Sequence, residues 1–248
     1  MKKPNLLIDI SNSWTKVGLG QGSTVRKAAT VETPRLSAAL LRKWINTHQP
    51  GHIIVASVVP AKTVMIRSNF PAEHLSFLSN SLKLPIRIRY PKPETIGADR
   101  LANSVAAAEL YLLPAVVIDF GTAVTFDIIS TRREYLGGVI APGLNAMTDY
   151  LHEKTALLPR IKLRRPRRSI AKSTVEAMQV GAITGYRGLI REILLSIRKE
   201  LKTRKLTVIA TGGHAALIAR TMPEVSCVNP LLTLQGLQFT RLYQLSLP

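Results

Sequence analysis

LLIDISNSWTKVGL (residues 6–19) and VVIDFGTAVTFDII (residues 116–129) share one pattern, and this pattern decides the fold. In each stretch an apolar run leads into an aspartate, Asp9 or Asp119, and then into a turn that contains small residues. An alternating segment follows, which is typical of a returning strand. The aspartates lie about 110 residues apart, the length of a small domain, so we predict a duplicated strand–turn–strand unit with one copy in each half.

Strands and helices alternate outward from these two stretches. Apolar or alternating runs predict further strands, and apolar residues at helical spacing predict helices between them. The strands are expected at 52–59, 86–90, 133–141 and 206–211, and the helices at 36–47, 60–66, 99–113, 144–157, 173–200, 215–220 and 231–245. The pattern predicts an α/β fold with an N-terminal half, 1–113, and a C-terminal half, 114–248, facing each other across a cleft.

The composition excludes several classes of protein. Hydrophobic residues make up 46% of the 248 residues, which is enough for real cores and too high for a disordered chain. Cys227 is the only cysteine, which excludes an intrachain disulfide and a multi-cysteine zinc site. The early apolar run, Leu6–Ile8, is too short for a signal peptide, and no stretch approaches the roughly 20 apolar residues of a membrane span. We therefore expect a soluble, cytoplasmic protein without membrane contact.

The net charge of +19 indicates either binding to an anionic partner such as a nucleic acid or a highly basic, solvated surface. A basic surface is typical of proteins that bind nucleic acids. However, the densest cluster, Lys162–Arg168, contains no aromatic residue that could stack on a base, and Pro166 interrupts any recognition helix. We expect this cluster to be a solvated basic loop without a specific nucleic-acid partner. A weaker possibility is long-range attraction of anionic substrates.

The turns after Asp9 and Asp119 are candidate phosphate sites. Small residues let the backbone approach a phosphate closely, and the turn N–H groups can then donate to it. A carboxylate at the same place can hold Mg²⁺ directly or through water. The alternative is an aspartate that only stabilises a β-turn. Because the pattern occurs twice, we favour a two-sided site for phosphate and cations.

A third candidate is Gly97-Ala98-Asp99-Arg100, at the start of an alanine-rich helix. A helix N-terminus stabilises an ionised carboxylate, so Asp99 could act as a general base and Arg100 could bind an anion. The residues alone favour the simpler interpretation of a helix cap beside a solvent-exposed arginine. Gly212-Gly213, after a predicted strand, could admit a nucleotide, but this is a weak signal.

Taken together, these motifs resemble the type III pantothenate kinase family of the acetate kinase/heat-shock 70/actin superfamily. The matches run in order through most of the chain: Asp9–Lys16, Gly97–Arg100, Asp119–Thr125, Gly137–Gly143, Ser173–Gly181, Thr211–Gly213 and Leu231–Leu237. The resemblance implies two ribonuclease-H-like (actin-like ATPase) halves, each a mixed sheet flanked by helices, with a cleft between them.

The resemblance also implies an activity, which is the ATP-dependent phosphorylation of pantothenate to 4'-phosphopantothenate, the first step of coenzyme A biosynthesis. It implies ATP, Mg²⁺ and a monovalent cation (K⁺ or NH₄⁺) as cofactors and a homodimer as the assembly. Asp99 would be the catalytic base. ATP and its phosphates would contact Asp9, Ser11, Asn12, Ser13, Lys16, Gly121, Thr122, Gly212 and Gly213. Pantothenate would contact Tyr90, Gly97, Ala98, Arg100 and Thr174. Asp9 would face Mg²⁺ through phosphate or water, and Asp119 would hold the monovalent cation.

The chain departs from the family pattern in its first motif. Ser11 stands where the family has glycine, so a Cβ lies where the backbone usually approaches phosphate. Ser13 replaces threonine and keeps the hydroxyl. Ser11 and the net charge favour a second interpretation, a catalytically silent relative that acts as a regulatory or nucleic-acid-binding factor. Another sugar or acid kinase of the superfamily fits less well, because Gly97–Arg100 and the helix at Thr174 match this family.

Overall fold

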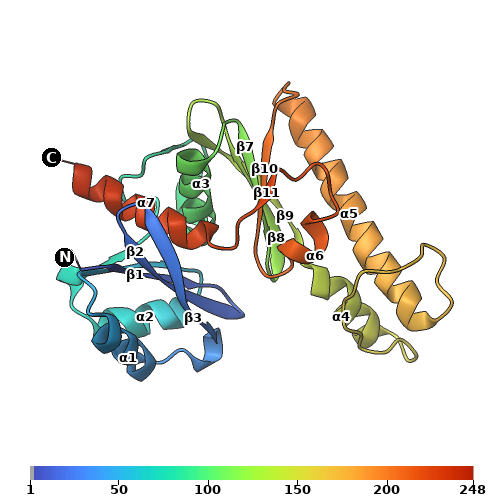
Figure 1. The fold of residues 1–248 in the computed structure, drawn as a ribbon, viewed down its shortest axis with the longest axis horizontal. Coiled ribbons are helices and arrows are strands. Elements are labelled where there is room, and N and C mark those ends of the chain that lie inside the picture. Colours follow the sequence, from blue (N-terminus) through green and yellow to red (C-terminus); the bar gives the residue numbers. More distant parts are fainter. Residues whose placement is uncertain (1–2, 248) are drawn as a thin grey trace. The chain divides into compact units, whose positions relative to one another are not determined.

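The computed structural model describes residues 3–247, which form two compact units. The first unit comprises residues 1–113, 127–137 and 231–248, and the second comprises residues 114–126 and 138–230. The chain therefore crosses between the units four times, before residues 114, 127, 138 and 231, and the C-terminal helix belongs to the first unit. Figure 1 shows the order of the elements along the chain.

A mixed sheet of five strands forms the centre of the first unit, in the order β3-β2-β1-β4-β5. β1 runs antiparallel to β2 and parallel to β4, and β5 continues the parallel side. The strands are β1 (Asn5–Ile10), β2 (Trp14–Gln21), β3 (Thr24–Glu32), β4 (His52–Ser57) and β5 (Leu75–Phe77). The helices are α1 (Ala38–His48), α2 (Pro60–Asn69), α3 (Ala98–Leu110) and α7 (Leu232–Ser246).

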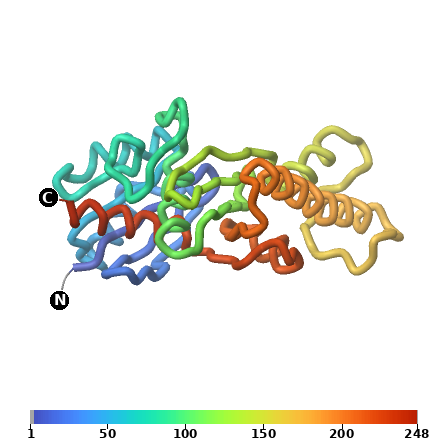
Figure 2. The backbone as a smooth tube through the Cα atoms, turned by 90° about the horizontal axis from the view of Figure 1, so that it is seen from above, coloured from blue at the N-terminus to red at the C-terminus, as the bar shows by residue number. Residues whose placement is uncertain are grey.

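Helices cover both faces of this sheet because β1 and β4 are apolar on both faces. Leu6 and Ile8 of β1 are buried in one core with Leu41 of α1 and Ile66 of α2. The other face is packed against α3 and α7. Figure 2 shows the C-terminal α7, in red, beside the blue N-terminal strands, although more than 200 residues of chain separate them. A buried hydrogen bond from the Thr233 hydroxyl to the Asn103 amide oxygen joins α7 to α3.

The second sheet has six strands in the order β11-β10-β7-β8-β9-β6. β10 pairs in parallel with both β7 and β11, and β6 pairs in parallel with β9. The strands are β6 (Arg87–Ile88), β7 (Ala115–Phe120), β8 (Ala123–Ile129), β9 (Glu134–Pro142), β10 (Thr207–Thr211) and β11 (Cys227–Val228). The helices of the second unit are α4 (Leu144–Lys154), α5 (Thr174–Glu200) and α6 (Ala215–Ala219). The predicted α/β class, with two mixed sheets flanked by helices, is confirmed.

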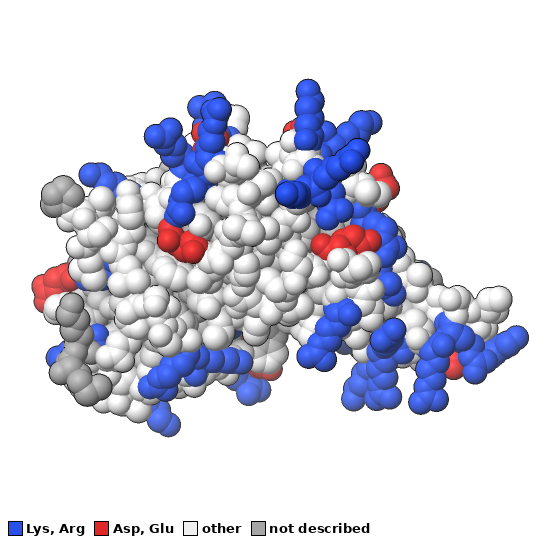
Figure 3. Space-filling model, turned by 45° about the horizontal axis from the view of Figure 1, so that its top comes forward, with Lys and Arg blue, Asp and Glu red and all other residues white. Residues whose placement is uncertain are grey.

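The basic cluster lies where no helix or strand forms, between α4 and α5. Its five charged side chains, Lys162, Arg164, Arg165, Arg167 and Arg168, are exposed, which confirms the prediction of a basic loop. Figure 3 shows Lys and Arg side chains at several places on one face of the molecule, with few Asp and Glu among them. Within residues 3–247, no helix is both long and apolar enough to cross a membrane.

Candidate active site

The first candidate turn joins β1 to β2 and places Asp9 opposite Lys16. Asp9 is buried at the end of β1 and is in register with Lys16 of β2, whose Nζ lies 3.9 Å from Asp9 Oδ2. The Ser11 hydroxyl donates to Asp9 Oδ1 at 3.4 Å, and the Ser11 N–H donates to the Trp14 carbonyl. Asn12 lies exposed in the turn itself. The structure therefore gathers Asp9, Ser11, Asn12, Ser13 and Lys16 on one hairpin.

Hydroxyl groups fix the backbone of this first turn. Thr33 donates its hydroxyl hydrogen to the Ser11 carbonyl at 2.7 Å, and its oxygen lies 3.0 Å from the buried hydroxyl of Thr15. The Thr33 N–H also donates to the Ser13 carbonyl. Ser11 is not among the described residues with positive φ, so a serine fits this position without backbone strain.

The third candidate motif, Gly97–Arg100, places Asp99 in the first turn of α3. Gly97 is the N-cap residue of this helix, with no side-chain cap, so the expected capping role of Asp99 is wrong. Asp99 Oδ1 instead accepts the Arg100 N–H at 2.9 Å. A Cβ at Gly97 would lie 2.5 Å from Asp99 Oδ1 and 3.5 Å from Val58 Cγ1, so glycine makes room for the carboxylate. Ala98, between them, is almost fully buried and anchors the start of the helix.

Arg100 is not the solvent-exposed arginine of the simpler interpretation. Its Nε donates to Asp127 Oδ1 at 2.7 Å, and its side chain is only 13% exposed. Tyr135 donates its phenol hydrogen to the same carboxylate oxygen at 3.2 Å. The guanidinium carbon of Arg100 lies 5.9 Å from the centre of the Tyr135 ring. Asp127 and Tyr135 were not predicted as site residues.

Burial and neighbouring charge shift the pKa values of Asp127 and Arg100 in opposite directions. Burial raises the pKa of the fully buried Asp127 to about 7, while the charge and hydrogen bond of Arg100 act to lower it. Burial alone would lower the pKa of Arg100, but the charge and hydrogen bond of Asp127 act against it, and the pKa is raised. Burial also raises the pKa of Tyr135, so its phenol stays protonated and acts as a donor. Asp127 Oδ2 has no hydrogen-bond partner among the described residues.

Tyr90 lies next to this group. Its ring packs edge-on against Tyr135, with 6.1 Å between ring centres and 65° between ring planes. Gly137, at φ +122, passes close to it, because a Cβ there would lie 3.5 Å from the Tyr90 ring. More than a third of Tyr90 remains exposed. The first unit therefore holds four of the five residues expected to bind pantothenate: Tyr90, Gly97, Ala98 and Arg100.

Two neighbouring turns of the second unit surround Asp119. Asp119 of β7 is in register with Thr211 of β10, so the turns after these two parallel strands lie side by side. Gly212, at φ +91, passes so close that a Cβ would lie 2.4 Å from Asp119 Oδ1 and 2.6 Å from the Phe120 nitrogen. Nothing lies within 4 Å of a Cβ added at Gly213. The buried Thr211 hydroxyl has no hydrogen-bond partner among the described residues.

A further glycine completes this second-unit site. Gly143, just before α4, donates its N–H to the Thr122 carbonyl at 3.1 Å. A Cβ at Gly143 would lie 2.1 Å from that oxygen, so only glycine fits. Gly121 donates its N–H to the Ala123 carbonyl and so tightens the turn after β7. The structure brings together Asp119, Gly121, Thr122, Gly212 and Gly213, as the sequence predicted, and adds Thr211 and Gly143.

Thr174 is the first residue of α5 and is exposed. Ser173 caps the helix by accepting the Glu176 N–H, and the Glu176 carboxylate accepts the Lys172 N–H. This reciprocal arrangement fixes where α5 begins and therefore fixes the position of Thr174. Thr174 belongs to the second unit, whereas the other expected pantothenate contacts belong to the first.

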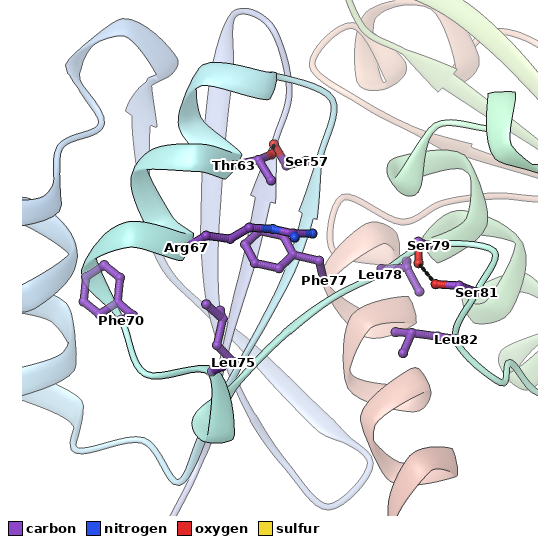
Figure 4. A pocket seen from close by; sticks show the side chains of 11 residues that line it. Ser57, Thr63, Arg67, Phe70, Leu75, Phe77, Leu78, Ser79, Ser81 and Leu82 are labelled. Atoms are coloured by element: carbon purple, nitrogen blue, oxygen red, sulfur yellow. Dashed lines mark hydrogen bonds between the residues drawn. The ribbon is translucent and has the colours of Figure 1, made fainter.

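A separate cavity of about 560 Å³ lies between α2 and the segment that follows it. Figure 4 shows the Arg67 side chain extended over the Phe77 ring, with 4.7 Å between the guanidinium carbon and the ring centre. Ser57, at the end of β4, and Thr63 contribute hydroxyl groups to its wall. None of the residues predicted for phosphate or pantothenate lines this cavity.

Comparison with known proteins gives one consistent result. The family model of type III pantothenate kinase matches residues 5–196. A type III pantothenate kinase of Akkermansia muciniphila is 47% identical over 94% of this chain and 96% of its own length. One from Methylacidiphilum infernorum is 43% identical over 94% of this chain and 86% of its own length.

Solved structures share the fold at low sequence identity. A conserved protein of the Baf family from Campylobacter jejuni superposes with a TM-score of 0.65 at 20% identity, over 98% of this chain and all of that chain. Component A of (R)-2-hydroxyglutaryl-CoA dehydratase from Acidaminococcus fermentans gives a TM-score of 0.54 at 12% identity, over 97% and 96% of the two chains. At these identities the similarity establishes the actin-like fold alone.

Proposed function

The chain belongs to the type III pantothenate kinase family, and we propose how its residues carry out the ATP-dependent phosphorylation of pantothenate, the first step of coenzyme A biosynthesis. Phosphoryl transfer needs positioning and charge neutralisation more than covalent chemistry by the protein. The alternative, a catalytically silent regulatory or nucleic-acid-binding factor, receives no support from the comparisons.

Asp99 is the general base on the pantothenate hydroxyl, and the start of α3 is the observation that carries this role. The positive end of the helix favours the ionised carboxylate. Asp99 Oδ1 accepts the neighbouring Arg100 N–H, and Gly97 makes room for the carboxylate, because a Cβ at position 97 would lie 2.5 Å from this oxygen. Tyr90, Gly97, Ala98, Arg100 and Thr174 bind pantothenate, so the base and the substrate contacts adjoin along the chain.

The two strand–turn sites receive ATP. Gly212 packs against Asp119 and Phe120, whereas nothing lies within 4 Å of a Cβ added at Gly213, so the backbone at Gly213 is open to the close approach of a nucleotide. Gly121 and Thr122 provide turn groups for the phosphates. On the first hairpin, Asp9, Ser11, Asn12, Ser13 and Lys16 face the phosphates, where the Lys16 ammonium neutralises charge.

The oxygen donors present fit the expected cations. Mg²⁺ would neutralise phosphate charge when bound, and Asp9 would face it through phosphate or water, with a carboxylate of the kind that Mg²⁺ prefers. Within residues 3–247 no cluster of three His, Cys, Asp or Glu residues could hold a metal, which is consistent with a cation held largely by phosphates and water. The Asp119 carboxylate beside the buried, unpartnered Thr211 hydroxyl suits K⁺ or NH₄⁺.

We also infer the oligomeric state of the protein and its cellular compartment. We infer a cytoplasmic homodimer, as the resemblance to the family implies. The prediction that residues 1–113 and 114–248 are the two duplicated halves also stands as a proposal. Size-exclusion chromatography with light scattering gives the mass in solution, and a monomer at micromolar concentration contradicts the dimer.

The decisive assay measures 4'-phosphopantothenate formation with ATP, Mg²⁺ and pantothenate, with and without K⁺. Asp99→Asn should reduce kcat by about 100-fold or more, because removing a general base costs about that much. Glu73→Gln, at an exposed site outside the turns, is the matched carboxylate-to-amide control and should leave the rate unchanged. No turnover of the wild type in either salt contradicts the kinase function, and an unchanged rate in Asp99→Asn contradicts the role of Asp99.

A further inference from the structure

The buried group around Arg100 has a function beyond packing. We propose that Asp127 and Tyr135 are positioning residues, which hold the guanidinium of Arg100 in the orientation that binds pantothenate. The inference rests on the proposed function, because it deepens the role given there to Arg100. Neither Asp127 nor Tyr135 needs to touch the substrate for this role.

The contact geometry supports positioning. Asp127 accepts from Nε of Arg100 at 2.7 Å, so the carboxylate holds the guanidinium at its Nε edge. A hydrogen bond at Nε fixes the plane of a side chain that otherwise has many rotamers. The Tyr135 ring, 5.9 Å from the guanidinium carbon, supports the same group from a second side. A substrate that meets a guanidinium already fixed in this way loses less entropy on binding.

The energetic cost of burying the Asp127 carboxylate also supports a positioning role. Asp127 is fully buried, and one of its two carboxylate oxygens has no hydrogen-bond partner among the described residues. Buried ion pairs seldom stabilise a fold more than apolar residues of similar size would. Replacing both Asp127 and Arg100 by apolar residues would therefore cost the fold little, whereas replacing Asp127 alone would leave the guanidinium of Arg100 without its carboxylate. What the carboxylate provides, and an aliphatic residue cannot, is an acceptor for Arg100 Nε.

Arg100 also needs a fixed partner because it follows Asp99 directly in the chain. An arginine beside the catalytic carboxylate is attracted to it, and an ion pair between them would compete with the substrate hydroxyl. The charge of Asp127 acts on Arg100 more strongly than that of Asp99 does. The buried carboxylate therefore keeps Arg100 committed to one orientation while Asp99 remains the base.

A double-mutant cycle on pantothenate binding tests this inference. Binding is measured by calorimetry, independently of turnover, for the wild type, Asp127→Asn, Arg100→Ala and the double variant. Asp127→Asn should weaken binding about fivefold or more, because the amide oxygen can still accept from Arg100 Nε but no longer carries the charge that strengthens this hydrogen bond. The same substitution should have almost no further effect in the Arg100→Ala background, because Asp127 acts only through Arg100.

Two further variants separate positioning from general loss of structure. Tyr135→Phe removes only the phenol oxygen and should weaken binding about two- to fivefold, so it tests the inference even if Asp127→Asn does not fold. Glu109→Gln removes the carboxylate paired with Arg133 at the other end of α3, and it should leave binding unchanged.

The results of these measurements distinguish failure of the positioning role from failure of the kinase function. Additive losses in the cycle, or wild-type affinity in a folded Asp127→Asn protein, overturn the positioning role and leave the kinase function intact. A wild type that neither binds nor phosphorylates pantothenate overturns the proposed function and this inference with it.

Discussion

Gly236→Ala should destabilise the first unit more than a single methyl group usually does. Gly236 lies on α7 where this helix meets α3. An added Cβ would lie 1.8 Å from the carbonyl oxygen of Ala102 and 2.5 Å from its carbonyl carbon. These are backbone atoms of a buried helix, so no flexible side chain can move aside. The helices would have to separate by more than about 1 Å to restore ordinary contact.

The magnitude follows from two opposing effects. Overpacking a close helix contact costs about 1–3 kcal/mol or more, and the backbone clash places this site at the upper end. Alanine recovers about 1 kcal/mol relative to glycine inside a helix. We expect a net loss of about 2 kcal/mol, which lowers the Tm by about 4–8 °C for a protein of this size. Turnover should fall as well, because Asp99 lies one turn before Ala102 on the displaced helix.

Gly188→Ala is the matched control. Gly188 lies in α5, is exposed, and has nothing within 4 Å of an added Cβ. The same substitution should therefore raise stability by about 1 kcal/mol through helix propensity alone. Thermal unfolding and pantothenate turnover are measured for both variants beside the wild type. If Gly236→Ala is as stable as the wild type, or gains stability as Gly188→Ala does, the close contact between α3 and α7 is refuted.

Two other predictions concern a buried histidine and the unusual serine. Burial lowers the pKa of His52, whose Nε2 lies 2.9 Å from the Ser76 hydroxyl, to about 4, and the charge of Arg241 acts in the same direction. Below pH 6.5 the unfolded chain therefore binds a proton at His52 that the folded chain does not bind. The free energy of unfolding should fall by about 3 kcal/mol between pH 6.5 and about 4. His52→Gln should flatten this dependence of stability on pH, and a pH profile identical to that of the wild type contradicts the role of His52. Ser11→Gly should lower the KM for ATP several-fold without changing the KM for pantothenate, because it removes the Cβ beside the phosphates. Glycine at this position should lower the stability by about 0.5–1 kcal/mol. A KM for ATP equal to that of the wild type contradicts steric hindrance by Ser11.

The sequence predicted the central strands and most helices, because local signals determine them. The apolar runs at 6–10, 115–120 and 206–211 are long enough to require burial, and they form β1, β7 and β10. β3 was missed, since Thr24–Glu32 mixes basic and small residues and is a strand only through its pairing with β2. β5 and β11 have three and two residues and carry no periodicity of their own.

The division into compact units depends on contacts that a linear pattern does not contain. Residues 127–137 and 231–248 join the first unit, although both lie in the second half of the sequence. The buried bond between Thr233 and Asn103 spans 130 residues. Helical spacing predicts that α7 exists and which face is apolar, but not which sheet it covers.

The sequence predicted the turns of the candidate site but not Asp127 and Tyr135, which form the buried group with Arg100. Asp9, Asp99 and Asp119 stand out because each interrupts or follows an apolar run. Asp127 also interrupts such a run, between Phe126 and Ile128, and this charged residue in a buried strand was the available signal. Its partner Arg100 lies 27 residues away, and only the fold brings the two side chains together.

In the proposed mechanism, the two copies of the strand–turn–strand pattern would contact phosphate by different means. In the first copy, side chains provide the polar groups, namely Asp9, the Ser11 hydroxyl and Lys16, and the Ser11 carbonyl is already bonded to Thr33. In the second copy, Gly212 packs against Asp119 with no room for a Cβ, and the neighbouring Gly213 leaves its backbone open to a ligand. In the proposed mechanism, a serine at position 11 is compatible with ATP binding because the turn at Gly213 does not depend on the first hairpin. The first hairpin would then contribute charge through Lys16 and Asp9.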